Sequence, residues 1–91
     1  MRATLLILAT VLAGCADGRP GPTEARAWFE ARYPGVRLTG VRNTEDEVVA
    51  RSYEFRYRAP GEAAERSVEV QFMEDGTGRW TDRPAAPSRL P

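Results

Sequence analysis

An apolar run near the N-terminus, Ala3 to Ala13, is the feature that most constrains how this chain of 91 residues folds. The run is 11 residues long and follows a single basic side chain, Arg2. As a helix it would span roughly 16 Å, about half the thickness of a bilayer core. A basic start, a short apolar core and small residues after it are typical of a secretory signal peptide. We therefore predict that residues 1–14 are a signal peptide and that only the rest of the chain folds.

The only cysteine, Cys15, follows this run and completes the sequence Leu12-Ala13-Gly14-Cys15. Small residues let a peptidase approach the backbone, and the cysteine sulfur is a nucleophile suited to accepting a diacylglyceryl group. The stretch resembles the lipobox of bacterial lipoproteins. That resemblance implies cleavage before Cys15, lipidation of its sulfur and further acylation, for example with palmitate, which together give stable membrane anchoring. It also implies a Gram-negative cell envelope, and Ala16 after the cysteine favours the periplasmic face of the outer membrane.

Composition narrows the function of the remaining 77 residues (91 − 14), which carry 12 arginines and 13 acidic residues, a formal charge of about −1. Nucleic-acid binding calls for a basic excess, which is absent. The chain has no histidine, and the anchor uses its only cysteine. An internal disulfide, a Cys/His zinc site and Ser/His or Cys/His catalysis are therefore excluded. We expect a domain that is not an enzyme and needs neither a metal nor a cofactor.

The chain after the signal peptide is expected to form one small domain with two irregular ends. Residues 15–22 are rich in Gly and Pro, which predicts a flexible tether of at most about 25 Å. Residues 83–91, RPAAPSRLP, contain three prolines and no periodicity, which predicts a disordered tail. Residues 23–82 are left to build a core without disulfides, which is close to the lower limit for a stable domain.

One amphipathic helix is predicted at the start of this domain, in TEARAWFEARYPG. Thr23 is the expected N-cap, and Pro34-Gly35 ends the helix because the residue before a proline avoids helical geometry. Four apolar side chains share one face at helical spacing: Ala25, Trp28, Phe29 and Tyr33. This face predicts packing against a core.

Three strands are predicted after the helix, in residues 36–42, 48–58 and 66–74, with a turn at 43–47. Alternation places four apolar side chains of the second strand on one face, with Arg51 as an exception: Val49, Tyr53, Phe55 and Tyr57. The third strand alternates in the same way: Val68, Val70 and Phe72. In the first strand Val36, Leu38 and Gly40 share a face, and Val41 breaks the pattern, which indicates a β-bulge near Gly40.

The turn Asp75-Gly76-Thr77-Gly78 favours a hairpin, and a short fourth strand is expected in the RWTD that follows. One helix followed by antiparallel strands predicts an α+β fold. We expect an N-terminal amphipathic helix packed on a three- to four-stranded antiparallel sheet.

Residues 24–80 resemble the PepSY and PepSY-like domains of secreted and envelope proteins. The likeness rests on the helix ending in Tyr33-Pro34-Gly35, on the strand sequence Tyr53-Glu54-Phe55 and on the turn Asp75-Gly76-Thr77-Gly78. The resemblance implies binding or inhibition, often of peptidases, with no catalytic residues to transfer. A second resemblance, to small outer-membrane assembly lipoproteins, implies a structural or assembly accessory. In both cases the expected partners are the membrane, through the lipid on Cys15, and another envelope protein.

Aromatic and arginine side chains give two candidate binding groups. The aromatic group is suited to stacking on a sugar, although in a small domain such side chains more often form the core: Trp28, Tyr53, Tyr57 and Trp80. Three arginines are suited to an anionic partner, although acids nearby favour a solvated sheet face: Arg51, Arg56 and Arg58.

Acidic side chains give two weaker candidates. Glu45-Asp46-Glu47 offers carboxylates for calcium, but adjacent acids lack the alternating spacing of a calcium loop, which favours a solvated turn. Glu30 and Glu54 are the carboxylates considered for an acid/base pair, and no motif in the sequence brings them together.

Overall fold

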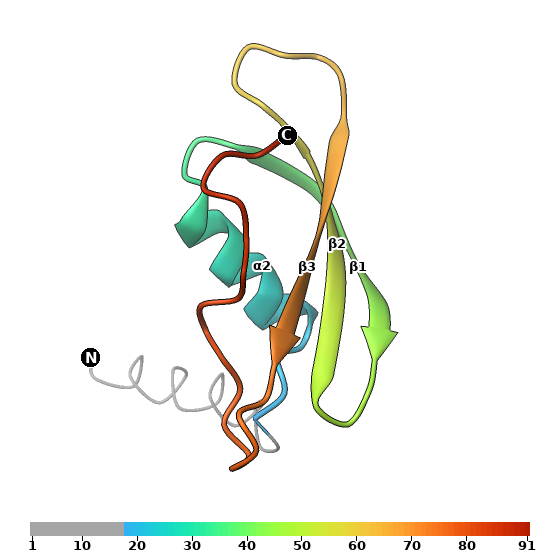
Figure 1. The fold of residues 1–91 in the computed structure, drawn as a ribbon. Helices are drawn as coiled ribbons and strands as arrows, with labels where there is room; N and C mark the ends of the chain where they lie inside the picture. The colour runs from blue at the N-terminus through green and yellow to red at the C-terminus, as the bar shows by residue number, and fades with distance from the viewer. Residues whose placement is uncertain (1–17) are drawn as a thin grey trace, which may run out of the picture.

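The computed structural model describes residues 18–91, so the predicted signal peptide and Cys15 lie outside the described residues. It contains one helix and three strands (Figure 1): α2 (Pro22–Arg32), β1 (Arg37–Asp46), β2 (Ala50–Arg58) and β3 (Arg66–Met73). The strands form one sheet in the order β1-β2-β3, and both pairs are antiparallel. The predicted α+β class is confirmed, with a sheet of three strands. Within residues 18–91 no helix has the length and apolar character needed to cross a membrane.

The helix α2 begins two residues earlier than predicted, because its N-cap is Gly21 and not Thr23. Gly21 is the N-cap and Pro22 the first helical residue, a position where proline fits because its missing N–H has no helical partner to lose. The Glu24 carboxylate accepts a hydrogen bond from the Gly21 N–H at 3.0 Å and so closes the first turn. Thr23 therefore lies inside the helix and is not its cap.

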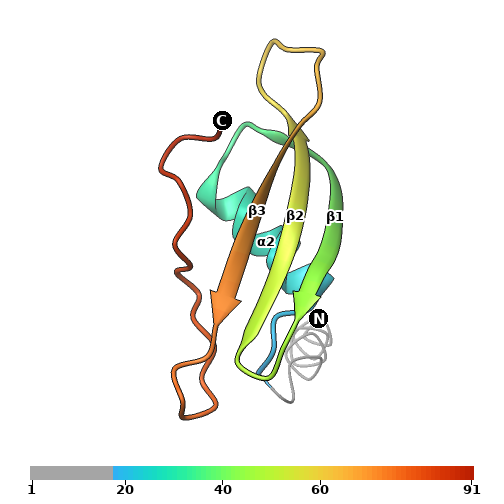
Figure 2. The same ribbon diagram turned by 45° about the vertical axis from the view of Figure 1, so that its right-hand side comes forward.

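The core lies between one face of the sheet and α2. Its fully buried aromatic side chains come from α2, β2 and β3: Phe29, Tyr53, Phe55, Tyr57 and Phe72. The ring of Phe29 stacks on Phe55 with centroids 4.7 Å apart, and Trp28 meets Phe72 edge-on at 5.3 Å. α2 lies over β1 and β2, and the C-terminal segment runs along the β3 side of the sheet (Figure 2). Aromatic contacts of this kind add to the free energy gained from burial alone.

A β-bulge in β1 sets which of its side chains face the core. Leu38 pairs with Tyr57 and Gly40 with Arg56, so Thr39 is an extra residue without a partner. The predicted bulge near Gly40 is confirmed. The bulge shifts the alternation by one residue, so Gly40 lies on the face opposite to Leu38, and the prediction that these two share a face is wrong.

The first hairpin turns later than predicted. β1 continues to Asp46, which pairs with Arg51, and the turn is closed by a hydrogen bond from the Glu47 N–H to the Ala50 carbonyl at 2.8 Å. The predicted turn at 43–47 is therefore mostly strand. Val49, predicted to face the core, lies in the turn and is 44% exposed. The sequence pattern missed this because polar side chains of β1 find hydrogen-bond partners on β2: the Asn43 side chain donates to the Ser52 backbone carbonyl at 2.9 Å.

The C-terminal segment 83–91 forms no helix or strand, yet it contacts the core. The Tyr33 hydroxyl donates to the Pro87 carbonyl at 2.5 Å, and the Tyr57 hydroxyl donates to the Pro91 carbonyl. Its apolar side chains pack against the core cluster: Ala86 and Leu90. The prediction of a disordered tail is therefore wrong for residues 83–91, because the hydroxyls of two core tyrosines bind the backbone of this segment.

The segment before the helix is also attached to the sheet. The Pro20 carbonyl accepts hydrogen bonds from the Tyr53 hydroxyl at 2.7 Å and from Arg51 at 3.4 Å. Arg19 forms an ion pair with Asp46 at 3.0 Å. From residue 18 onward, the stretch predicted as a flexible tether is thus part of the folded domain.

Candidate functional site

The structure divides the four candidate aromatic residues into two pairs. Tyr53 and Tyr57 are completely buried, and burial raises the pKa of both phenols. They belong to the core and have no face available for stacking on a sugar. Trp28 and Trp80 are only half-buried, and both line a cleft on the surface.

This aromatic cleft has a volume of about 200 Å³ and lies where four segments meet. Its walls come from the segment before α2, from α2, from the end of β3 and from the chain after the last turn: Gly18, Pro20, Glu24, Trp28, Phe72, Trp80, Thr81 and Asp82. Residues far apart in the sequence thus form one apolar hollow, which periodicity within a single element does not reveal.

A small hairpin after β3 positions Trp80. Glu74 and Trp80 form an isolated antiparallel bridge, and the Thr81 N–H donates to the Met73 carbonyl at 2.9 Å. The fourth strand predicted in RWTD is reduced to this bridge. The turn itself is held by Asp75, whose carboxylate accepts hydrogen bonds from the Thr77 N–H and hydroxyl. These bonds lower the pKa of the Asp75 carboxyl.

The segment before the helix closes one side of the aromatic cleft. The Arg19 guanidinium lies 5.8 Å from the centre of the Trp80 ring, within the range of a cation–π contact. Gly18 has a φ of +78°, and a Cβ at this position would lie 3.3 Å from both the Gly78 carbonyl oxygen and Trp80 Cδ1. Glycine is thus favoured here, since both the backbone conformation and the close approach disfavour a side chain.

The chemistry of the aromatic cleft suits a side chain of another protein. Ligand pockets for whole small molecules usually have about 300–1,000 Å³, which exceeds its 200 Å³. Its lining combines aromatic side chains with the acidic residues Glu24 and Asp82. An apolar or aromatic residue with a basic neighbour is the complementary partner, because tryptophans are typical of interface hot spots.

The three candidate arginines do not form one patch. Arg51 extends on the helix side of the sheet, where it pairs with Asp46 at 3.3 Å and donates to the Pro20 carbonyl. Arg56 lies on the opposite face and pairs with Glu65 at 2.7 Å. Arg58 is exposed beyond it. Arg51 and Arg56 therefore have separate partners, and the three arginines do not present a common anion site.

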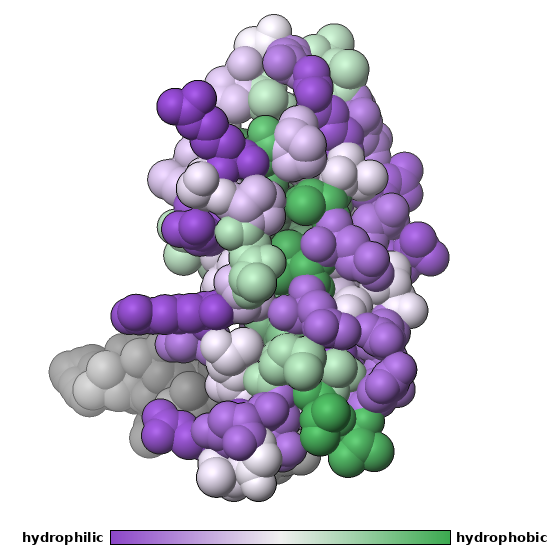
Figure 3. All heavy atoms as spheres, in the orientation of Figure 1, coloured by the Kyte–Doolittle hydropathy of each residue, from purple (hydrophilic) through white to green (hydrophobic). Residues whose placement is uncertain are grey.

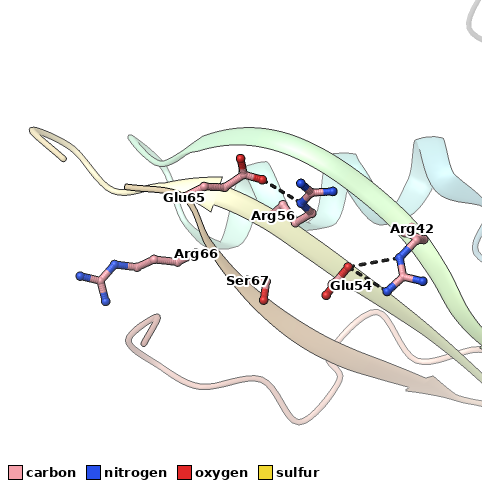
Figure 4. A pocket seen from close by; sticks show the side chains of 6 residues that line it. All are labelled: Arg42, Glu54, Arg56, Glu65, Arg66 and Ser67. Carbon is pink, nitrogen blue, oxygen red and sulfur yellow. Dashed lines mark hydrogen bonds and ion pairs between the residues drawn. The ribbon is translucent and has the colours of Figure 1, made fainter. Parts of the chain in front are cut away.

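The outer face of the sheet is polar and carries two ion pairs that Figure 4 shows. Arg42 donates to Glu54 at 3.1 Å, next to the Arg56–Glu65 pair. Figure 4 shows these side chains on the strands with the helix behind the sheet, while Arg66 points away from them. Exposed pairs of this kind contribute little to stability, and this face is suited to remaining in water.

The acidic candidates are separated as well. Glu45 accepts hydrogen bonds from Ser52 and Gln71, which lower its pKa, whereas Asp46 pairs with Arg19. Glu47 has a raised pKa because of its hydrogen bond to Glu45 and the charge of that neighbour. Across residues 18–91 no three acidic, histidine or cysteine side chains are grouped to hold a metal ion.

The two carboxylates of the candidate acid/base pair, Glu30 and Glu54, also lie in different parts of the domain. Glu30 lies on α2 within 3.9 Å of Arg26, and Glu54 lies on the outer face of the sheet with Arg42. The core separates the helix from that face, so the two carboxylates do not share a site.

The fold and the aromatic cleft define a small α+β domain with a surface suited to binding. Comparison of the chain with protein-family models, with curated proteins and with solved structures finds no match. The functional interpretation therefore rests on the residues of this chain. The sequence pointed to Trp28 and Trp80 but not to Glu24, Phe72 or Asp82, which carried no signal of a shared site.

Proposed function

We propose that the protein is a lipoprotein of the Gram-negative cell envelope whose small domain binds another envelope protein without catalysing a reaction. Lipid on Cys15 would anchor it to the membrane, on the periplasmic face of the outer membrane. In this proposal the helix packed on the sheet serves as a rigid support for the aromatic cleft. The PepSY-like sequence features favour the same role, with a peptidase or a sensor as the class of partner.

The aromatic cleft is the observation that carries the binding role. Trp28 and Trp80 are the two aromatic side chains of the original candidate group that remain accessible, and the fold brings them to one hollow. Half-buried tryptophans give a large contact area at a low entropic cost. The size of the cleft favours one inserted side chain of a protein partner.

The anchor is tested by intact mass of the full chain produced in a Gram-negative host, beside Cys15→Ser. We expect a mass equal to residues 15–91 plus acyl chains, and loss of both cleavage and acylation in the variant. An unacylated wild-type protein would disprove the lipoprotein proposal.

The binding role is tested in the same cells with a photo-crosslinking amino acid at Asp82, an exposed residue that lines the aromatic cleft. The matched control places it at Ser67, which is exposed on the outer face of the sheet. A discrete protein adduct from position 82 that is absent from position 67, and that is lost with Trp80→Ala, supports binding in the cleft. Equal adducts from both positions contradict it, and an adduct with a large outer-membrane complex favours the assembly role.

A further inference from the structure

Three large apolar side chains remain exposed in the described part of the chain, and all lie at one end of the sheet. Val48 is 78% exposed, Val49 44% and Met73 44%. The valines form the tip of the β1–β2 hairpin, and the Glu74 N–H donates to the Val49 carbonyl at 2.9 Å, which places the end of β3 beside this tip. Figure 3 shows hydrophobic spheres at this lower end of the molecule, within an otherwise largely polar edge. We call these three side chains the apolar tip.

The chain enters the domain at the same end. Arg19 pairs with Asp46, two residues before Val48, at 3.0 Å. Gly18 lies against Gly78 in the loop that follows β3. Figures 1 and 2 both show the start of the described chain, the β1–β2 turn and this loop together at the lower end. The loop between β2 and β3 lies at the opposite end in both views.

The reach of the chain between the anchor and the domain is short. Gly18 is three residues after Cys15, so the two Cα atoms are separated by at most about 11 Å when the chain is fully extended. The polar interface of a bilayer is roughly 5–8 Å deep on each side. If Cys15 is lipidated, as the proposed function requires, Gly18 is held beside the headgroups. The end of the sheet that contains the apolar tip is then held there too.

We propose that the apolar tip rests on the lipid bilayer and fixes the orientation of the domain on the membrane. This inference depends on the proposed lipid anchor, and it adds which end of the domain faces the lipid. Three side chains alone bind a bilayer weakly, but the anchor gives them a high effective concentration at the surface. Their role is therefore to orient the domain.

The charges around the apolar tip are compatible with this position. Asp46 is paired with both Arg19 and Arg51, at 3.0 and 3.3 Å, so its charge is compensated. Glu45 is directed to the outer face of the sheet, where it accepts hydrogen bonds from Ser52 and Gln71.

The orientation has a consequence for the aromatic cleft. Gly18 and Trp80 line the cleft and also lie at the end of the domain from which the anchor extends. A partner that inserts a side chain there must approach close to the membrane surface. Membrane-associated proteins are therefore favoured over freely diffusing ones.

The orientation is tested with the full lipidated protein in vesicles of phosphatidylethanolamine and phosphatidylglycerol. Because Cys15 is the only cysteine and the lipid occupies it, Val48→Cys provides a unique thiol for an environment-sensitive fluorophore. The matched control is Ala63→Cys, exposed in the β2–β3 loop at the opposite end. The label at position 48 should shift to shorter wavelength and lose most of its emission to nitroxide lipids. The label at position 63 should instead be quenched by iodide in the water.

Intact mass of each labelled sample separates a failure of the orientation proposal from a failure of the lipoprotein proposal. Acylated protein with both labels equally open to iodide overturns the orientation and leaves the lipoprotein proposal standing. Unacylated protein overturns both. A second experiment places the label at Met73→Cys, once with both valines present and once in the double variant Val48→Ser, Val49→Ser. Loss of most of the nitroxide quenching seen with the valines present supports the proposal, and unchanged quenching contradicts a role for the valines.

Discussion

Removing residues 83–91 should destabilise the domain by about 2–4 kcal/mol. The deletion takes away the carbonyl acceptors of the Tyr33 and Tyr57 hydroxyls and uncovers part of the core. Two hydrogen bonds at about 0.5–1.5 kcal/mol each give roughly 1–3 kcal/mol. Partial burial of Leu90 adds about 1 kcal/mol, compared with about 1.5–3 for complete burial of such a side chain.

The size of this loss relative to the total makes the deletion a sharp test. At about 0.05–0.15 kcal/mol per residue, the described 74 residues (91 − 17) are expected to have a free energy of unfolding of roughly 4–11 kcal/mol. The tail would then supply a large part of the stability. A disordered tail, as its proline content predicts, would supply none.

The assay is urea unfolding of residues 16–91 and 16–82, followed by the fluorescence of Trp28 and Trp80. Tyr33→Phe is made in both chains as a double-mutant cycle. We expect it to cost about 1 kcal/mol with the tail present and almost nothing without it, because the Pro87 acceptor is then already gone. An unchanged unfolding midpoint after the deletion, or an equal cost of Tyr33→Phe in both chains, would refute the reasoning.

Three further predictions concern the core and the last turn. Phe29→Ala should cost about 3–5 kcal/mol, measured by thermal unfolding, because the ring is fully buried and its removal leaves a cavity; a loss below 1 kcal/mol would contradict its place in the core. Tyr53 and Tyr57 should ionise above the ordinary value of 10.0 in an ultraviolet titration, since burial raises their pKa; their contribution to stability is complete below pH 10 and is lost as the pH rises through the raised values. The pKa of Asp75 should lie below 3.8 by carbon NMR and move up towards it in Thr77→Ala. Because the pKa of Asp75 is lowered in the folded state, its ionised carboxylate stabilises the fold above pH 3.8, and this contribution is lost as the pH falls through the folded pKa.

The amphipathic helix and the buried face of β3 were predictable because one local period describes each of them. Ala25 and Phe29 share the apolar side of α2, Tyr33 follows at its C-cap, and all three are buried, as their spacing indicates. Val70 and Phe72 alternate with polar residues on β3 and are buried as well. In both elements the burial pattern repeats along the chain itself, so neighbouring residues carry the information.

The first hairpin was less predictable because its ends depend on pairing between strands. A run of polar residues in the sequence indicates a turn, yet Asn43 and Glu45 are paired with β2 and satisfied by it. Val49 continues the sequence alternation of β2, but it lies in the turn before that strand begins at Ala50. Pairing energy across the sheet therefore decided the ends of the strands, and β-propensity alone does not contain that energy.

The sequence by itself determined the α+β class, the helix and the alternation of β3, because each depends on residues close together in the chain. The lipid anchor at Cys15 stays a prediction. Only the tertiary structure decided which aromatic side chains are accessible and what covers the core. An α-helix is about 10 Å wide, and a three-stranded sheet is at least as wide, so α2 covers β1 and β2 and leaves the β3 side to other segments. The C-terminal segment lies there because Tyr33 and Tyr57 bind its carbonyls. The same lateral arrangement leaves Trp28 and Trp80 at the surface, where they line the aromatic cleft.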